Sequence, residues 1–443
     1  MGRFKEVIKN IFSIPELRRR IFITLGLLAI FRLGAFIPLP GLNVSAIAAW
    51  IKAQQDKMGG QMFGLINIFS GGAMQQMSIF SLGIMPYISA SIIFQLLVKV
   101  IPQLEAITKE GPSGYRKISQ YTRYATVGIC IIQSMFILRM IQTNPLHLPD
   151  KGNVGMVLNP GPGFLFVGVL ALMAGTMFVM WLGEQISEYG IGNGSSLIIM
   201  AGIVDGMPRA ARQLIQEEVG IDKILTLLAI YIVVVISIVL TTQAQRRIPV
   251  QHAKHTRGRR QYGGQRNYLP LRVNQAGVMP VIFASSIMIL PAMIARAIGW
   301  APLQEAFARQ GFIFSIFYIV LVVFFTYFWT ALFFQPSEMS NQLKEHGSFV
   351  PGIRPGKRTA EYLEFIMNRI ALVGASYLCL VALMPDIVAG AMGVERTVTR
   401  FLGGTGILIV VGVGLDMMQK IESHLLMRSY EGFMKKGRVR GRR

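Results

Sequence analysis

The chain has 443 residues, a formal net charge of +22 and 52% hydrophobic residues, but only 15% charged residues. A mean hydropathy of +0.49 is too high for an ordinary soluble domain, so the composition excludes that class and predicts a membrane-embedded chain. Because a helix needs about 20 apolar residues to cross the roughly 30 Å hydrocarbon layer, the length leaves room for about ten crossings.

The N-terminal segment, residues 1–20, is polar and basic, and the apolar run after it lacks a small-residue cleavage pattern. We therefore expect a cytosolic segment followed by a retained first span, with no secretory signal. Apolar segments then follow at about residues 21–38, 77–98, 118–140, 163–183, 194–208, 221–242, 275–298, 312–334, 366–385 and 401–420. They predict an all-α polytopic membrane protein with ten transmembrane helices, followed by a basic tail at residues 425–443.

Charge decides the status of the fifth segment, 194–208, which is short and carries Asp205. With ten spans and a cytosolic N-terminus, Lys and Arg are about three times as frequent on the cytosolic side as on the other, as the positive-inside rule requires. Without the fifth span, the very basic segment 243–272 would lie outside. We therefore expect the fifth span to exist and both termini to face the cytosol.

One short motif occurs twice, as GIMPYISAS at residues 83–91 and as GVMPVIFAS at 277–285, with six of nine positions identical. The copies fall in the second and seventh spans, so an offset of five crossings gives the halves 21–210 and 211–424 opposite orientations. Pro86 and Pro280 should interrupt their helices, and paired broken helices point to a pathway between the halves. A kink that is merely tolerated in each helix is the alternative.

Longer motifs resemble a known family. They are GIMPYISASI (83–92), RKISQYTRY (116–124), MWLGEQISEYGIGNG (180–194), LPLRVNQAGVMPVIFASS (269–286) and SFVPGIRPGKRT (348–359). They are similar to those of the bacterial SecY family, the central channel subunits of the Sec protein translocase, and the resemblance runs from about residue 15 to 436. It implies two inverted five-helix halves around a central hourglass pore in the inner membrane. It also implies a protein-conducting channel that passes unfolded secretory polypeptides and releases hydrophobic segments sideways into lipid.

The resemblance implies a ring of aliphatic side chains at the narrowest point of the pore. The matching positions are Ile84, Ile88, Ser195, Ile199, Ile282 and Ile409. Residues spaced i, i+4 share a helix face, and an apolar constriction resists wetting. Ser195 departs from the pattern, because isoleucine is typical there; its hydroxyl either loosens the seal or bonds to its own helix backbone.

The segment at about 62–74 is apolar but too short to cross the membrane. By resemblance it is the plug, a re-entrant half-helix that blocks the outer cavity, and its residues are Phe63, Leu65, Ile66, Ile68, Phe69, Gly71 and Gly72. The two glycines would provide a hinge. An interfacial amphipathic helix is the other interpretation of this segment.

Spans two and seven form the lateral gate of the family. Gln95 and Asn274 match a polar cluster at that seam, and Pro86 and Pro280 lie on the same two helices. Amides that bond across helices contribute on the order of 1 kcal/mol each, which would bias a closed state without locking it. Interfacial residues that bond to headgroups or water are the alternative.

Two connections, residues 243–272 and 335–365, are expected in the cytosol. The first carries no acidic residue and eight basic residues, among them Arg246, Arg247, Arg257, Arg259 and Arg260. The second holds Arg354 between two Pro-Gly turns. Such density suits a polyanion, either ribosomal RNA or anionic lipid. By resemblance both connections dock the ribosome or a motor ATPase.

No residue pattern predicts an enzyme, a cofactor or a metal site. There is no GxxxxGK[ST] phosphate loop, so a partner must supply energy, and the five histidines form no HExxH motif. The implied partners are SecE-like and SecG-like membrane subunits, a SecA-like motor, the ribosome, signal peptides with unfolded substrates, and membrane lipid. A secondary transporter of a small solute is the competing hypothesis, although such proteins need intramembrane charges and only Arg32, Asp205 and Asp416 are candidates.

Overall fold

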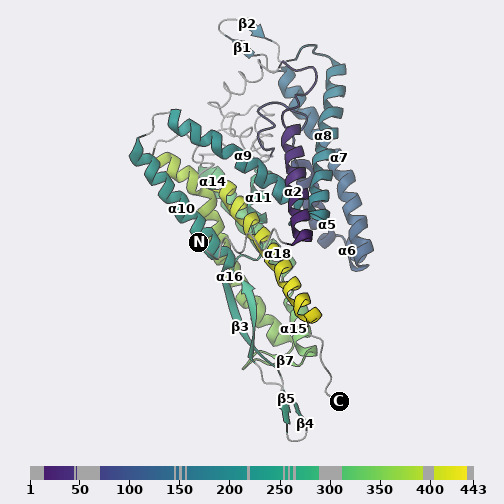
Figure 1. Cartoon of the computed structure of the whole chain (residues 1–443), viewed down its shortest axis with the longest axis vertical. Coiled ribbons are helices and arrows are strands. Elements are labelled where there is room, and N and C mark those ends of the chain that lie inside the picture. The colour runs from purple at the N-terminus through teal and green to yellow at the C-terminus, as the bar shows by residue number, and fades with distance from the viewer. Residues whose placement is uncertain are drawn as a thin grey trace. The chain divides into compact units, whose positions relative to one another are not determined.

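The computed structural model resolves the chain into two compact units, residues 1–212 with 413–443 and residues 213–412. The described residues are 14–43, 46, 70–143, 146–148, 152–154, 157–216, 220–252, 255–257, 260–262, 266–288, 312–392 and 404–436. Helices dominate both units (Figure 1), so the predicted helical fold class is confirmed.

Long helices make up the first unit. In chain order its elements are α2 (Pro15–Gly34), α5 (Met85–Val100), α6 (Pro102–Lys109), α7 (Pro112–Thr143), the hairpin β1 (Leu146–Leu148) and β2 (Gly152–Val154), α8 (Pro162–Tyr189), α9 (Gly194–Gln216) and most of α18 (Thr405–Lys436). Proline occupies the first or second position of α2, α5, α6 and α8. At these positions the missing N–H costs no intrahelical hydrogen bond, so the prolines set where helices start.

Small residues let the elements of the first unit approach closely. A Cβ added to Gly168 of α8 would lie 2.7 Å from Cδ1 of Leu138 on α7, and one added to Gly175 would lie 2.1 Å from the carbonyl oxygen of Ile79. The same core contains Leu138 and Leu172, which are almost fully buried. α8 therefore packs directly against α7 and against the turns that precede α5, as helices do where glycine replaces bulk.

The second unit combines helices with a small sheet. Its elements are α10 (Ile221–Gln243), β3 (Gln245–His252), β4 (His255–Arg257), β5 (Arg260–Tyr262), β6 (Arg266–Arg272), α11 (Met279–Ile287), α14 (Phe312–Phe333), α15 (Pro336–Glu345), β7 (Ser348–Phe349), α16 (Lys357–Met392) and the start of α18 (Thr405–Lys436). α14 contacts both α11 and α16. Phe283 of α11 stacks on Trp329 of α14 with ring centroids 5.2 Å apart, so aromatic packing joins these helices.

The segment expected as a cytosolic loop, 243–272, consists largely of strands. β3 is the central strand of an antiparallel sheet of order β6-β3-β7. Along β3, Ile248 and Val250 are buried while Arg247 and Pro249 are exposed, which is the period-two pattern of a half-buried strand. The buried face packs with Leu363 and other residues of α16 in a separate core.

Five described helical segments are long and apolar enough to cross a membrane, namely Pro112–Arg139, Pro162–Tyr189, Ile221–Gln243, Phe312–Glu345 and Lys357–Met384. α5 and α6 together would give a sixth, although they are bent by 98° at their junction. The apolar helix Gly194–Pro208 is shorter, as expected for the fifth segment. Parts of the predicted spans 275–298 and 401–420 lie outside the described residues, so the count of ten stays a prediction.

Candidate functional site

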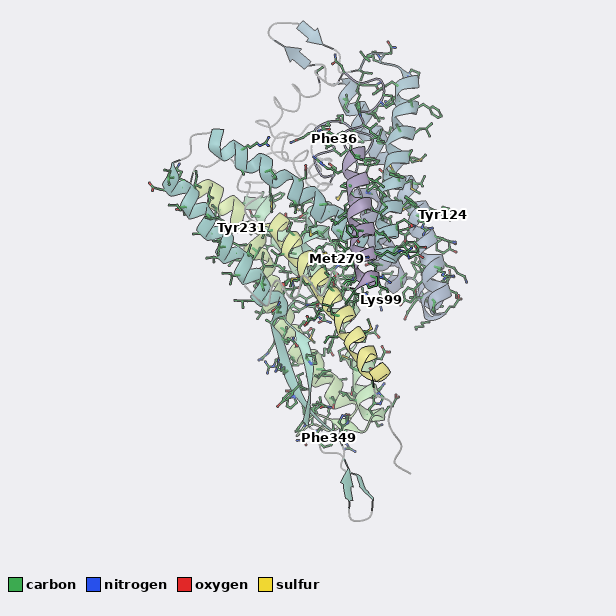
Figure 2. All side chains as sticks on the ribbon, in the orientation of Figure 1. Phe36, Lys99, Tyr124, Tyr231, Met279 and Phe349 are labelled. Atoms are coloured by element: carbon green, nitrogen blue, oxygen red, sulfur yellow. The ribbon has the colours of Figure 1, made fainter. Side chains whose placement is uncertain are left out.

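Both copies of the repeated motif follow the same local backbone course. Gly83 has a φ of +55° and Gly277 a φ of +63°, a region that favours glycine, and a helix begins two residues later in each case. Met279 marks the start of α11 in Figure 2. Pro86 and Pro280 are therefore second residues of their helices. The expectation that they break a continuing helix was wrong, because no helical turn precedes them to clash with their rings.

Four of the predicted pore-ring residues lie in the first unit. Ile84 and Ile199 are almost fully buried, whereas Ile88 and Ser195 are partly exposed. The N–H of Ile88 donates to the carbonyl oxygen of Ile84 at 3.1 Å, so the two residues lie one helical turn apart. A Cβ on Gly183 of α8 would lie 3.4 Å from Cδ1 of Ile84 and 3.6 Å from the backbone nitrogen of Ser195. The structure thus brings the start of α5 and the start of α9 to the same glycine.

The other two ring residues, Ile282 on α11 and Ile409 on α18, lie in the second unit. They are 5% and 1% exposed. Their helices share one core, because Val281 of α11 packs in the same cluster as Leu408 of α18. The closing of all six residues into one ring stays a prediction.

A polar cavity of about 580 Å³ opens among α5, α7, α8 and the start of α9. It is lined by Tyr87, Ser119, Arg123, Trp181, Gly183, Glu184, Gln185, Ser187, Glu188, Asn193 and Ser195. The polar groups of its lining are carboxylates, amides, hydroxyls and a guanidinium. No group of three or more metal-ligating side chains lies together in the part of the chain that the structure describes. The lining therefore offers both hydrogen-bond donors and hydrogen-bond acceptors.

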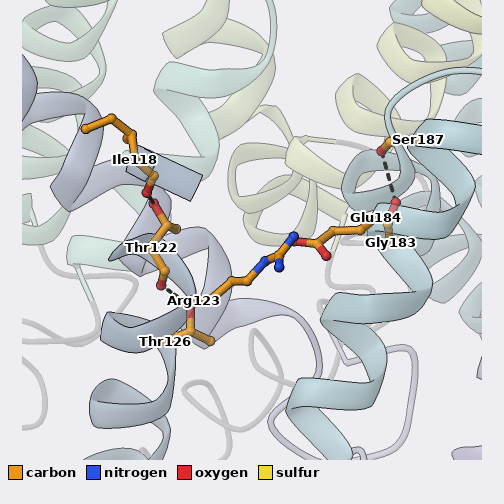
Figure 3. Close-up of polar contacts among 7 residues, drawn as sticks. All are labelled: Ile118, Thr122, Arg123, Thr126, Gly183, Glu184 and Ser187. Carbon is orange, nitrogen blue, oxygen red and sulfur yellow. Dashed lines mark hydrogen bonds and ion pairs between the residues drawn. The ribbon is translucent and has the colours of Figure 1, made fainter. Parts of the chain in front are cut away.

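An ion pair between two residues of the cavity lining joins α7 to α8. Nε of Arg123 lies 2.9 Å from Oε1 of Glu184, with side chains 45% and 25% exposed (Figure 3). At such exposure a salt bridge contributes about 0–1 kcal/mol to the stability of the fold. Its main effect is therefore to orient the two side chains in the cavity lining. The sequence motifs predicted no role for Arg123 or Glu184. Both lie in those motifs, at 116–124 and 180–194, but no spacing rule pairs residues 61 positions apart.

The connection GIGNG, residues 190–194, forms a tight loop between α8 and α9. Gly192 has a φ of +95°, and Asn193 caps α9 by accepting hydrogen bonds from the N–H groups of Ser195 (3.1 Å) and Ser196 (3.4 Å). Ser187 of α8 donates to the carbonyl oxygen of Gly183 at 2.9 Å and accepts from the N–H of Gly194 at 2.8 Å. The cap and this bridge hold Ser195 at the cavity wall.

The predicted gate residues have different surroundings. Nε2 of Gln95 donates to Oγ of Ser91 on its own helix at 3.1 Å. Oδ1 of Asn274 is buried and has no hydrogen-bond partner among the residues described. The predicted polar cluster between the two helices stays a prediction, as does the gate.

The predicted plug falls mostly outside the described residues, which leave out Phe63, Leu65, Ile66, Ile68 and Phe69. Residues 70–74 form successive turns, so the expected half-helix does not extend to residue 74. Gly71 and Gly72 have φ values of +64° and +82°, which explains why glycine occupies both positions.

The predicted docking tip around Arg354 has a fixed backbone and an exposed side chain. Gly352 and Gly356 have φ values of +82° and +104°. Oγ1 of Thr359 donates to the carbonyl oxygen of Arg354 at 3.0 Å, and Oγ of Ser340 donates to that of Gly356 at 2.7 Å. The turn is therefore held from two helices without use of the arginine side chain.

The sheet joins this tip to the basic segment. Arg246 and Arg247 are exposed on β3. β3 pairs with β7, where Nδ1 of His252 lies 2.7 Å from Oγ of Ser348 and its Nε2 lies 3.2 Å from Nδ2 of Asn267 on β6. The backbones of Arg257 and Arg260 pair with each other in the β4–β5 hairpin, and Arg259 lies outside the described residues. The two predicted docking connections thus form one folded substructure.

Comparison with known proteins gives a consistent result. A family model described as SecY matches residues 78–418. The protein translocase subunit SecY of Thermotoga maritima is 41% identical over 440 residues, covering 99% of this chain and 100% of that protein. The corresponding subunit of Escherichia coli K12 is 44% identical over 440 residues, with 97% and 96% covered.

Solved structures show the same fold at low sequence identity. A structure described as a protein conducting channel matches with a TM-score of 0.58 and 16% identity, covering 92% of each chain. Sec61 from a canine ribosome-channel complex of the endoplasmic reticulum matches with a TM-score of 0.53 and 16% identity over the same shares.

Proposed function

Since the chain belongs to the SecY family, we propose that it is a protein-conducting channel that moves unfolded secretory polypeptides across the cytoplasmic membrane. The observation that carries this proposal is identity of 41–44% to translocase subunits over 97–99% of the chain. Similarity of that extent leaves no large part of the chain for another activity. The chain acts as a conduit and not as an enzyme, and its partners supply the energy.

The local geometry supports a pathway that the two repeats share. Each repeat places a glycine turn before a helix, and predicted pore residues lie at or just before the start of that helix, Ile84 and Ile88 in one repeat and Ile282 in the other. In the proposed mechanism these residues, with Ser195, Ile199 and Ile409, form the apolar constriction. Hydrophobic substrate segments leave into lipid between α5 and α11, the second and seventh spans.

The chain is a multi-pass membrane protein that works within a translocon complex. We assign it to the inner membrane with both termini in the cytosol, because that orientation places most Lys and Arg inside. Small SecE-like and SecG-like subunits pack on its lipid-facing helices. A SecA-like motor and the ribosome bind the substructure that carries Arg354, Arg246 and Arg247, which lies in the cytosol in this orientation.

The charges of the spans argue against the alternative of a secondary transporter. Nη2 of Arg32 lies 2.6 Å from Oδ2 of Asp205, and Nζ of Lys420 lies 3.2 Å from Oδ2 of Asp416. Ion-coupled transporters use intramembrane charges to bind the coupling ion. Here each candidate acid already has a basic partner.

Reconstitution tests the proposed function directly. The purified chain is placed in lipid vesicles with its small membrane subunits, a motor ATPase, ATP and a secretory precursor. We expect the precursor to become protected from added protease only when ATP and the chain are both present. A precursor that stays wholly accessible, together with saturable uptake of a small solute, would overturn the proposal.

Replacement of Ser195 by isoleucine should reduce the resting ion conductance of the channel. The side chain lies at the wall of the polar cavity, where added apolar volume makes the constriction harder to wet. Conductance in planar bilayers measures this, and Ser196→Ile is the matched control because the neighbouring residue does not line the cavity. Equal conductance in the Ser195→Ile variant and the parent would contradict the role of this position.

A further inference from the structure

Three segments of the first unit meet at Arg32. Its Nη2 lies 2.6 Å from Oδ2 of Asp205 on α9, and its Nη1 donates to the carbonyl oxygen of Gly71 at 2.8 Å. The guanidinium also lies over the ring of Phe36, 4.9 Å from its centroid. A planar guanidinium presents several donors in a fixed fork, so a single side chain can hold two partners in defined directions.

The contact at Gly71 is closely packed. Gly71 is buried with a φ of +64°, and a Cβ added there would lie 2.9 Å from Cα of Gly202 on α9 and 3.5 Å from the ring of Phe31. Phe31 in turn stacks on Phe80, with centroids 6.2 Å apart and planes 5° apart. The segment 70–84, which we call the turn segment, is therefore seated against both α2 and α9 at this point.

The ion pair explains why two charges are placed within apolar helices. Asp205 follows the apolar run LIIMAGIV of α9, and Arg32 lies near the end of α2. A charge in a membrane span is costly alone, and such charges pair with one another or with backbone carbonyls. Arg32 does both. Without the carboxylate, the guanidinium would be free to extend toward water or headgroups, as arginine side chains near helix ends do.

We propose that Asp205 is a positioning residue for the start of α5. By holding the guanidinium of Arg32 on the carbonyl of Gly71, it fixes the turn segment, which contains Ile84 and leads into the helix that carries Ile88. The consequence for the channel rests on the proposed function, since these two isoleucines belong to the predicted constriction. The seating of the turn segment does not rest on it, because the geometry lies within one unit of the resting protein.

A cysteine reporter tests the seating. Ala73 is 0% exposed in the turn segment, and native Cys130 is 0% exposed on α7 in the same unit. The full chain carrying Ala73→Cys is reconstituted in nanodiscs without substrate, and the rate of modification by N-ethylmaleimide is measured separately at residue 73 and at Cys130, apart from the other native thiol, Cys379. Asp205→Asn should raise the rate at residue 73 roughly tenfold, as expected from loss of a charge-assisted hydrogen bond, while Cys130 stays protected.

Asp205→Glu is the conservative variant and should restore protection at residue 73, because it returns a carboxylate to the same helix position. Ser81→Cys, at a position 2% exposed, serves as a second reporter if Ala73→Cys folds poorly. An unchanged rate in Asp205→Asn would overturn the proposal. An equal rise in the modification rate of Cys130 and of residue 73 would also overturn the proposal, because it would indicate that Asp205 stabilises the whole unit.

Resting ion conductance then tests the consequence for the channel. Asp205→Asn should raise it, and Asp205→Glu should not. A change in labelling without protein translocation by the parent would refute the proposed function and leave the positioning role standing. Translocation by the parent with no change in labelling would refute the positioning role of Asp205 and leave the proposed function standing.

Discussion

Arg354→Glu should abolish motor-driven translocation while the variant still folds and inserts. The side chain is exposed, and the turn is held by hydrogen bonds from Thr359 and Ser340 to backbone carbonyls, so the fold does not depend on the arginine. Loss of a central interface arginine costs about 2 kcal/mol or more, roughly thirtyfold in affinity, and reversal of its charge adds repulsion from an acidic partner. Protease protection of a precursor in proteoliposomes with the motor and ATP measures the effect.

Lys357→Glu is the matched control for this variant. Lys357 is exposed three residues away, so the substitution changes the net charge of the surface equally. If the partner recognises Arg354 specifically, the Lys357→Glu variant should retain most of its translocation activity. Added salt should weaken the remaining electrostatic attraction of that variant to the partner by screening. Equal loss in both variants would indicate a diffuse electrostatic attraction, and normal transport by Arg354→Glu would refute the docking role.

The repeated motif shows what a sequence predicts well. Six identical positions of nine indicated that two distant segments share a conformation, and the structure gives both the same positive-φ glycine and the same helix start. The sequence could not say whether Pro86 kinks a helix or begins one. That depends on the turns from residue 70 to 84, which pack against α8 and α2 through contacts that no local pattern encodes.

The strands of segment 243–272 were missed for a different reason. Its basic residues indicated a solvated loop, and their density obscured the alternation of buried Ile248 and Val250 with exposed Arg247 and Pro249. Leu269 and Leu271 alternate similarly on β6, where Leu269 lies opposite Ile248 and Leu271 lies opposite Arg246. The polar cavity shows more clearly what the sequence cannot predict. Its ion pair joins α7 to α8 across 61 residues and follows only from the fold.

Gly194→Ala should destabilise the first unit and move the start of α9. A Cβ at this position would lie 1.9 Å from the carbonyl oxygen of Gly183, so α9 must shift away from α8 or the backbone of α8 must give way. Such overpacking costs about 1–3 kcal/mol. The loss of stability is measured by thermal unfolding in detergent, with the modification of buried Cys130 as the signal that reports unfolding.

Gly128→Ala supplies the contrast, because nothing lies within 4 Å of a Cβ on this residue of α7. Alanine has the higher helix propensity, by up to about 1 kcal/mol, so this variant should be as stable as the parent or more stable. The same Gly→Ala change thus has opposite expected signs at two positions, and only the approach of α9 to α8 distinguishes them. Gly194 also donates its N–H to Ser187 and lies next to Ser195 at the cavity wall. A shift of α9 should therefore alter resting conductance as well as stability, whereas equal behaviour of the two variants would show that the close approach of the helices is not maintained in the membrane.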